Sequence, residues 1–253
     1  MRIKYKILLV TLLSIIITGC SSAQTENRVD AAELDAMLSK IYKENEPGAS
    51  VVIIKNNQTI FQNSYGMADV ELSVPINDNM VYRIGSLTKQ FTAASIMKLI
   101  EQGKLKLSDQ IDNYLPDFPT RGQTITIENL LTHTSGIGNF ENLEKSMMET
   151  TEKGLTVEQI IKFFKSQPSE FNPSSAYSYS NPGYILLGAI IEKISNVTFQ
   201  EFGKTEIFEP LEMNNSYYGD ATLIIPGRVK GYHRTEDGFV NAEHFNSAIP
   251  YAA

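Results

Sequence analysis

The chain has 253 residues, of which 42% are hydrophobic and 20% are charged, and its formal net charge is −7. This composition is ordinary for a globular protein with a hydrophobic core and excludes a largely disordered chain. The negative charge argues against a nucleic-acid-binding protein, because affinity for nucleic acid comes largely from Lys and Arg side chains that neutralise phosphates.

The first 19 residues differ in composition from the rest of the chain. Arg2, Lys4 and Lys6 make a basic start, and the apolar run ILLVTLLSIII follows before the residues TGC. This order is typical of an export signal. The alternative is a permanent transmembrane anchor, but the apolar run is much shorter than the roughly 20 residues that a spanning helix needs. Residues 1–19 contain three basic and no acidic residues, so the chain without them has a formal charge of −10.

Cys20 is the only cysteine in the chain, and it follows the apolar run in the sequence IITGC. This segment resembles the lipobox of bacterial lipoproteins, which implies cleavage before Cys20 and attachment of lipid to it. A stray free thiol is the alternative. We therefore expect an exported lipoprotein, anchored at the periplasmic face of a membrane or at the cell surface. The mostly polar residues 20–30 are expected to be a tether between lipid and domain.

The first predicted elements of the domain are a helix and a hairpin. Residues 31–43 predict an amphipathic helix, because apolar residues recur there at helical spacing. These residues are Leu34, Met37, Leu38 and Ile41. Two runs rich in β-branched residues follow in GASVVIIKNNQTIFQNSYG, on either side of an Asn-Asn pair that tolerates the positive φ of a tight turn. This stretch predicts a β-hairpin.

The remainder of the chain is predicted to be mainly helical. One helix follows the sequence VYRIG and ends near Gly103, and a shorter one lies in TIENLLTH. Another is expected in TVEQIIKFFKS, where Thr156 and Gln159 can form a capping box. The last begins at NPGYILLGAIIEKIS, with Pro182 in its first turn. No repeat or long linker interrupts the chain, so residues 31–253 are expected to form one domain.

Two serine–lysine pairs with S-x-x-K spacing lie in RIGSLTKQFTAASIMK, namely Ser86 with Lys89 and Ser95 with Lys98. On a helix either lysine could reach its serine. Ser86 opens the predicted helix, where free N–H groups and the helix dipole favour a developing negative charge. Ser95 lies inside the helix, where a serine hydroxyl more often bonds the carbonyl four residues back. This context favours Ser86 with Lys89; the alternative is an N-cap serine beside a solvated lysine.

A second short motif, Y-x-N, is formed by Tyr179 and Asn181 in the sequence YSYSNPGY. It lies in the loop that enters a predicted helix, from which polar side chains can project into a cleft. The alternatives are that Asn181 caps the helix before Pro182 and that Tyr179 packs within the fold. About one such match is expected by chance, so the motif gains weight only in combination with the first.

Together these residues resemble the penicillin-recognising serine hydrolases, which include class C β-lactamases, D-alanyl-D-alanine carboxypeptidases and related esterases. The segments YRIGSLTKQFTA, LSDQIDNYLPDF, ITIENLLTHTSGI, YSNPGYILLGAIIEKIS and IFEPLEMNNSYY look like family segments in family order. The resemblance implies an α/β fold of the β-lactamase and transpeptidase type, with an antiparallel sheet flanked by helices and a helical subdomain beside it.

Carried over to this chain, the resemblance implies that Ser86 is the acylated nucleophile and that Lys89 takes or relays its proton. Tyr179 would assist proton transfer to the leaving group, and Asn181 would bind the amide of the substrate. The form Y-x-N, where class A β-lactamases have S-x-N, favours the class C and carboxypeptidase side of the family. The implied substrates are β-lactams, D-amino-acid peptides of the cell wall, or esters, and no cofactor is expected.

The three histidines are not expected to carry the chemistry. The resemblance makes the LLTHTSG segment around His133 a shared structural turn, so His133 is not expected to be a catalytic base. His233 and His244 have no carboxylate or histidine at ligand spacing, so no metal site is expected.

The third motif of the family, K-[ST]-G or H-x-G on a strand that lines the cleft, does not occur in the 253 residues. We therefore expect a truncated chain that lacks the C-terminal strands of the family fold. The alternative function is then a catalytically inactive homologue that binds cell-wall peptide or a protein partner. The sequence predicts no particular oligomeric state.

Overall fold

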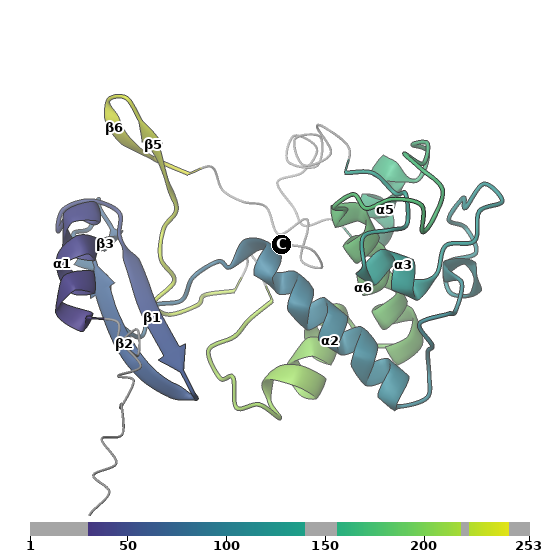
Figure 1. Ribbon diagram of the computed structural model, residues 1–253, viewed down its shortest axis with the longest axis horizontal. Coiled ribbons are helices and arrows are strands. Elements are labelled where there is room, and N and C mark those ends of the chain that lie inside the picture. Colours follow the sequence, from purple (N-terminus) through teal and green to yellow (C-terminus); the bar gives the residue numbers. More distant parts are fainter. Residues whose placement is uncertain (1–29, 140–155, 219–222, 243–253) are drawn as a thin grey trace, which may run out of the picture.

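The structure, a computed structural model, describes residues 30–139, 156–218 and 223–242. The expected export signal, Cys20, the tether as far as residue 29, and His244 lie outside these residues. The described part of the chain divides into a small part built on a β-hairpin and a larger helical part (Figure 1). No helix within it has both the length and the apolar character needed to cross a membrane.

The small part contains the predicted helix and hairpin. Its elements are α1 (Ala31–Ile41), β1 (Ala49–Lys55), β2 (Gln58–Tyr65), β3 (Met67–Asp69) and β4 (Val74–Pro75). β1 and β2 pair antiparallel, and β3 pairs antiparallel with β4. Asn56 and Asn57 turn the chain between β1 and β2 with φ angles of 51° and 60°. Asparagine is one of the few residues that adopt this left-handed conformation readily, so the predicted hairpin is confirmed together with its cause.

α1 packs on the hairpin through a narrower face than the sequence predicts. Leu38 is buried against Phe61 and Tyr65 of β2. Met37 and Ile41 are 50% and 56% exposed, so their expected place in the buried stripe is wrong. A two-stranded hairpin offers a helix only a narrow surface, and Leu38 with the partly buried Leu34 fills it.

The helical part contains most of the chain. Its elements are η1 (Gly85–Leu87), α2 (Thr88–Glu101), η2 (Ile111–Asn113), α3 (Ile127–Leu131), α5 (Val157–Phe164), α6 (Asn181–Ser195), α7 (Phe199–Gly203) and the π-helical turn η3 (Lys204–Phe208). The predicted capping box of Thr156 and Gln159 begins α5, and both of its hydrogen bonds are present. Gly103, just beyond α2, has a φ of 69°, as expected of a helix stop.

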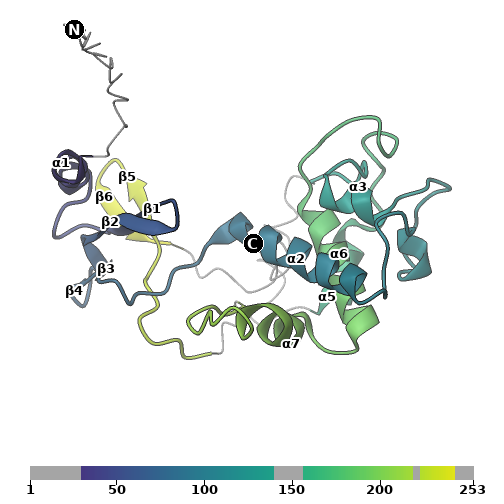
Figure 2. The same ribbon diagram turned by 60° about the horizontal axis from the view of Figure 1, so that its bottom comes forward.

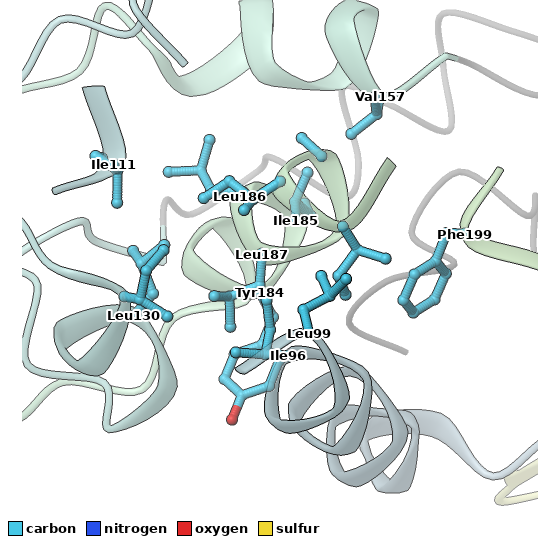
Figure 3. Close-up of a cluster of buried hydrophobic side chains, with 14 of the residues drawn as sticks. Ile96, Leu99, Ile111, Leu130, Val157, Tyr184, Ile185, Leu186, Leu187 and Phe199 are labelled. Atoms are coloured by element: carbon cyan, nitrogen blue, oxygen red, sulfur yellow. The ribbon is translucent and has the colours of Figure 1, made fainter. Parts of the chain in front are cut away.

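α6 is the centre of the large hydrophobic core. Residues 180–191 are all buried, so the first three turns of this helix are enclosed by the rest of the helical part. Figure 3 shows Tyr184, Ile185, Leu186 and Leu187 among the buried side chains of other elements. Side chains from α2, α3, α5 and α7 contact it, as do those of the loops between these helices. Ser180 caps its first turn by accepting a hydrogen bond from the Gly183 N–H at 3.0 Å, and Pro182 lies in the first turn as predicted. The burial of α6 therefore fixes the position of the Y-x-N motif, because Tyr179 lies just before this helix and Asn181 is its first residue.

A second hairpin, β5 (Tyr232–Thr235) with β6 (Gly238–Asn241), is not predicted by the sequence analysis. The dipeptide Asp237-Gly238, between two short runs of strand-forming residues, is the signal that could have predicted it. The hairpin contacts the segment around β3, because the N–H of Val70, directly after that strand, donates to the Tyr232 hydroxyl at 2.8 Å. Lys230 adds an ion pair to Asp69 at 3.0 Å.

The described elements make a mixed α/β structure with antiparallel pairing, as the resemblance implies. The hairpins and α1 lie to one side and the other helices to the other in two views 60° apart (Figures 1 and 2). In both views the N-terminal end of α2 points toward the hairpin part. Ser86 lies directly before this end of the helix.

Candidate active site

Ser86 lies in the short 3₁₀ turn η1 and not in the first turn of the α-helix, which begins two residues later at Thr88. Gly85 precedes it with a φ of 54°, a conformation that suits glycine. The Ser86 side chain is exposed. Within the described residues the Ser86 N–H donates no hydrogen bond, so it is available near the positive end of α2. A negatively charged oxygen near Ser86 would be stabilised by both features.

Lys89 brings a buried ammonium group to Ser86. Its side chain is only 7% exposed, and its Nζ donates to the Ser86 Oγ at 3.3 Å and to the Asn181 Oδ1 at 2.7 Å. The same nitrogen lies 4.6 Å from the ring centroid of Tyr179 and 5.6 Å from that of Tyr184. The aromatic faces and the amide oxygen thus replace part of the water that an exposed lysine would have around it.

Tyr179 contacts the same serine from a distant segment of the chain. Its hydroxyl donates to the Ser86 Oγ at 2.8 Å, although 93 residues separate the two along the chain. The side chain is 38% exposed. The structure therefore brings all four predicted site residues together, from two segments: Ser86 and Lys89 from η1 and α2, and Tyr179 and Asn181 from the start of α6.

Asn181 is 8% exposed and is the first residue of α6, so the cap of this helix is the neighbouring Ser180 and not Asn181. Its Oδ1 is the acceptor for Lys89. Its N–H donates to the Asn139 Oδ1 at 3.4 Å. Asn181 therefore positions the lysine, and the direct contact with substrate that the resemblance implies stays a prediction.

Two further residues of the site are not predicted by the sequence analysis. Tyr184, one turn into α6, donates from its hydroxyl to the Leu131 carbonyl oxygen at 3.0 Å. Burial, followed by the negative charge that Tyr179 would carry, raises the pKa of Tyr184 above its ordinary value, so Tyr184 stays protonated. His133 contacts the rings of both tyrosines, with centroids 4.7 Å from Tyr179 and 5.0 Å from Tyr184.

The second S-x-x-K pair has a structural explanation. Ser95 is fully buried inside α2, and its hydroxyl donates to the Phe91 carbonyl oxygen four residues back at 2.8 Å. Lys98 is partly exposed and forms an ion pair with Glu101 at 3.6 Å. This is the arrangement predicted for a serine inside a helix.

The other histidine in the described residues does not join the site. His233 lies exposed on β5. Across the described ranges, no three His, Cys, Asp or Glu side chains are grouped as ligands of a metal ion would be.

The arrangement suits nucleophilic catalysis. The Ser86 hydroxyl is exposed to a reactant, and two groups that can accept or relay its proton lie within 3.3 Å. Serine becomes an effective nucleophile when such a group is within hydrogen-bond reach. The N–H of Ser86 and the positive end of α2 lie where the oxyanion of an acylation intermediate could be stabilised.

The sequence model of the beta-lactamase family matches residues 31–252, and the chain therefore belongs to this family. A penicillin-binding protein of Bacillus subtilis (strain 168) is 30% identical over 201 residues, which cover 79% of this chain and 44% of that protein. The predicted family is thus confirmed.

Solved structures agree with this assignment. A penicillin-binding protein homologue of Pyrococcus abyssi, described as octameric, matches with a TM-score of 0.73 and 32% identity, over 89% of this chain and 52% of that one. The D-amino acid amidase of Ochrobactrum anthropi, in complex with L-phenylalanine amide, matches with a TM-score of 0.71 and 26% identity, over 86% and 65% of the two chains. The predicted fold class is confirmed, and the chain spans between 44% and 65% of the length of these three relatives.

Proposed function

We propose that the protein is a serine hydrolase that forms an acyl-enzyme on Ser86 and acts on β-lactams, D-amino-acid peptides or esters. The observation that carries this proposal is the approach of Tyr179 and Lys89, at 2.8 and 3.3 Å, to a single exposed serine oxygen. The Tyr179 contact joins residues 93 apart in sequence, as expected of a functional constellation and not of a helix cap.

The proposed reaction has two steps. In the first, the Tyr179–Lys89 pair has lost one proton, as a neutral lysine amine or a tyrosine phenolate. The Ser86 Oγ attacks the carbonyl carbon of the substrate while its own proton passes to this pair. The tetrahedral intermediate then expels an amine or an alcohol that takes up the same proton from Tyr179, which returns the pair to its starting form. In the second, water attacks the ester on Ser86, releases the acid and restores the serine hydroxyl. Asn181 holds Lys89 in place at 2.7 Å throughout.

The relatives support this class of substrate. One is called a penicillin-binding protein, and another a D-amino acid amidase. A β-lactam ring and a D-amino-acid amide share an acyl carbon bonded to nitrogen, which an activated serine can attack. Because the chain spans only 44% and 65% of the length of these two proteins, the choice among β-lactam, peptide and ester stays a proposal.

The experiment that tests the proposal compares two serine variants. The purified protein and its Ser86→Ala and Ser95→Ala variants are incubated with benzylpenicillin and, separately, with p-nitrophenyl acetate. We expect a covalent adduct in the intact mass, or burst release of p-nitrophenol, with the unaltered protein and with Ser95→Ala, because Ser95 bonds only within its helix. We expect neither signal with Ser86→Ala. Equal reaction of Ser86→Ala would show that Ser86 is not the nucleophile.

The second candidate is an inactive homologue that binds a cell-wall peptide or a protein partner. The absence of K-[ST]-G and H-x-G from the 253 residues favours it. Titration calorimetry with a muropeptide ending in D-alanyl-D-alanine distinguishes the two functions. Saturable heat without adduct or product would support the binding function, and an adduct on Ser86 would contradict it.

We also propose that the protein is exported and held at a membrane by lipid on Cys20, as the basic start, the apolar run and the IITGC sequence suggest. Because Cys20 is the single cysteine of the chain, its replacement tests the proposed lipid attachment directly. We expect the full chain in the membrane fraction of a bacterial host and the Cys20→Ala variant outside it or unprocessed. Equal membrane retention of processed protein in both cases would contradict lipidation.

A further inference from the structure

The HTSG segment supports the loop that carries Tyr179. Three backbone hydrogen bonds join the two segments: the Ser178 N–H donates to the His133 carbonyl at 3.0 Å, the Ser174 N–H to the Thr134 carbonyl at 2.8 Å, and the Glu170 N–H to the Gly136 carbonyl at 2.8 Å. Gly136 has a φ of 77°, and a Cβ added to it would lie 2.1 Å from the Phe171 carbonyl oxygen. The two segments are therefore held in close backbone contact.

His133 extends this contact through its side chain. The Ser180 N–H donates to the His133 Nδ1 at 3.1 Å, across 47 residues of sequence. Ser180 lies between Tyr179, which bonds the Ser86 Oγ, and Asn181, which bonds Lys89. The hydrogen bond thus fixes the peptide that joins two residues of the candidate site. It requires a neutral imidazole with its proton on Nε2, because a protonated Nδ1 cannot accept.

The surroundings of His133 favour that neutral form. Its ring packs on Tyr179 and Tyr184 at 4.7 and 5.0 Å and meets the more exposed Tyr177 edge-on at 6.0 Å. The charged group that faces it is Lys89 on α2, which lies against the same two tyrosine rings. Burial, followed by the positive charge of Lys89, lowers the pKa of His133 below its ordinary value.

We propose that His133 is a positioning residue, which holds the segment from Tyr179 to Asn181 against Ser86 by accepting the Ser180 N–H. This inference rests on the proposed acylation of Ser86. His133 contacts neither Ser86 nor the reacting atoms in this arrangement; it acts through Tyr179. Protonation of the imidazole removes the acceptor, so acylation should slow as the pH falls through the pKa of His133.

Two variants separate the hydrogen bond from the backbone conformation. His133 has a φ of 59°, which Asn and Gly both tolerate. In His133→Asn the Oδ1 can take the place of Nδ1 as acceptor and does not titrate. In His133→Gly the acceptor is gone. We expect His133→Asn to keep the acylation rate with benzylpenicillin but to lose its decline at low pH, and His133→Gly to react roughly 10-fold more slowly.

A second measurement, NMR of the histidine side chains, does not depend on catalytic activity. Imidazole NMR on ¹⁵N-histidine-labelled protein, assigned with the His133→Asn variant, reports the tautomer and titration of each of the three histidines. We expect His133 to be the Nε2–H tautomer and to titrate below the ordinary histidine range. An Nδ1–H tautomer, or wild-type rates and pH profile in His133→Gly, would overturn the proposal. Absence of acylation in the unaltered protein would contradict the proposed function, while the tautomer would still decide whether Nδ1 accepts the Ser180 N–H.

Discussion

Lys89 is the residue of the site with the most unusual surroundings. A lysine is rarely as buried as this one, and here its ammonium is held by Ser86, Asn181 and two aromatic faces. Such a position requires specific partners, because a buried charge without them is strongly unfavourable. A solvated lysine beside a capping serine, the alternative considered from sequence, needs none of these contacts.

Replacement of Lys89 tests its role in proton transfer. We expect Lys89→Met to remain folded, because methionine occupies a similar volume and the change removes a buried charge. Its acylation rate should fall about 10²- to 10⁴-fold, the usual contribution of a positioned proton acceptor. Lys98→Met, in the other S-x-x-K pair, is the matched control and should react at the unaltered rate, because Lys98 only pairs with Glu101. Equal rates for the two variants would exclude Lys89 from proton transfer.

Replacement of the tyrosines in the YSYSNPGY loop tests the role of the Tyr179 hydroxyl. Tyr179→Phe keeps the ring beside His133 and Lys89 but removes the hydroxyl that bonds Ser86, so acylation should slow by about 10²-fold or more. Tyr177→Phe changes the same loop at an exposed position, 69% accessible, and should leave the rate unchanged. Stopped-flow release of p-nitrophenol measures both. A larger loss in Tyr177→Phe would contradict the role proposed for Tyr179.

Residue patterns predicted part of this site and missed the rest for a physical reason. Ser86 and Lys89 stand three residues apart at a helix start, and Tyr179 and Asn181 form a short motif, so local spacing is enough to propose them. The contact of His133 with Ser180 spans 47 residues and has no local signature. Its role became visible only when the fold placed the two segments together.

At the scale of elements, α6 determines whether the site can exist. It carries Asn181 at its first position, and the side chains of its first three turns are buried against the rest of the helical part. We expect Leu186→Ala, at a fully buried position, to lower the free energy of unfolding by about 2–5 kcal/mol, measured by urea denaturation. Leu211→Ala, at a position 65% exposed, is the control and should change it by less than about 0.5 kcal/mol. Similar changes in the free energy of unfolding for both variants would contradict the claim that α6 forms the centre of the large core.

The two hairpins differ in how clearly the sequence predicts them. The Asn56-Asn57 pair predicted the first hairpin because left-handed φ angles at a two-residue turn have few compatible residues. The Asp237-Gly238 signal of the second hairpin is weaker, because the two strands beside it have four residues each and are mostly exposed. Such strands lack a clear alternation of apolar and polar positions in the sequence.

At the scale of the whole molecule, the described residues hold two separate hydrophobic clusters of unequal size. The larger surrounds α6, and the smaller joins α1 to one face of β1 and β2. The other face of that hairpin exposes Val52, Ile54 and Ile60 at 57%, 62% and 38%. Stability should therefore be distributed unevenly over the molecule.

Hydrogen exchange followed by mass spectrometry tests this distribution. We expect amides of α6 and of the buried face of α2 to exchange most slowly, because they open only with the large core. Amides of β1 and β2 should exchange faster, because a two-stranded hairpin with one exposed apolar face has little burial to hold it closed. If the amides of β1 and β2 exchanged as slowly as those of α6, the two parts of the molecule would not differ in stability as expected.

The measurement that tests the central claim most directly is the location of the covalent adduct within the chain. Trypsin cuts after Arg83, Lys89 and Lys98, so Ser86 and Ser95 fall in separate peptides, residues 84–89 and 90–98. After reaction with benzylpenicillin, we expect the added mass on the peptide of residues 84–89, whose only hydroxyl groups are those of Ser86 and Thr88, and fragmentation should place it on Ser86. An adduct on the peptide of residues 90–98, or on any residue other than Ser86, would contradict the account.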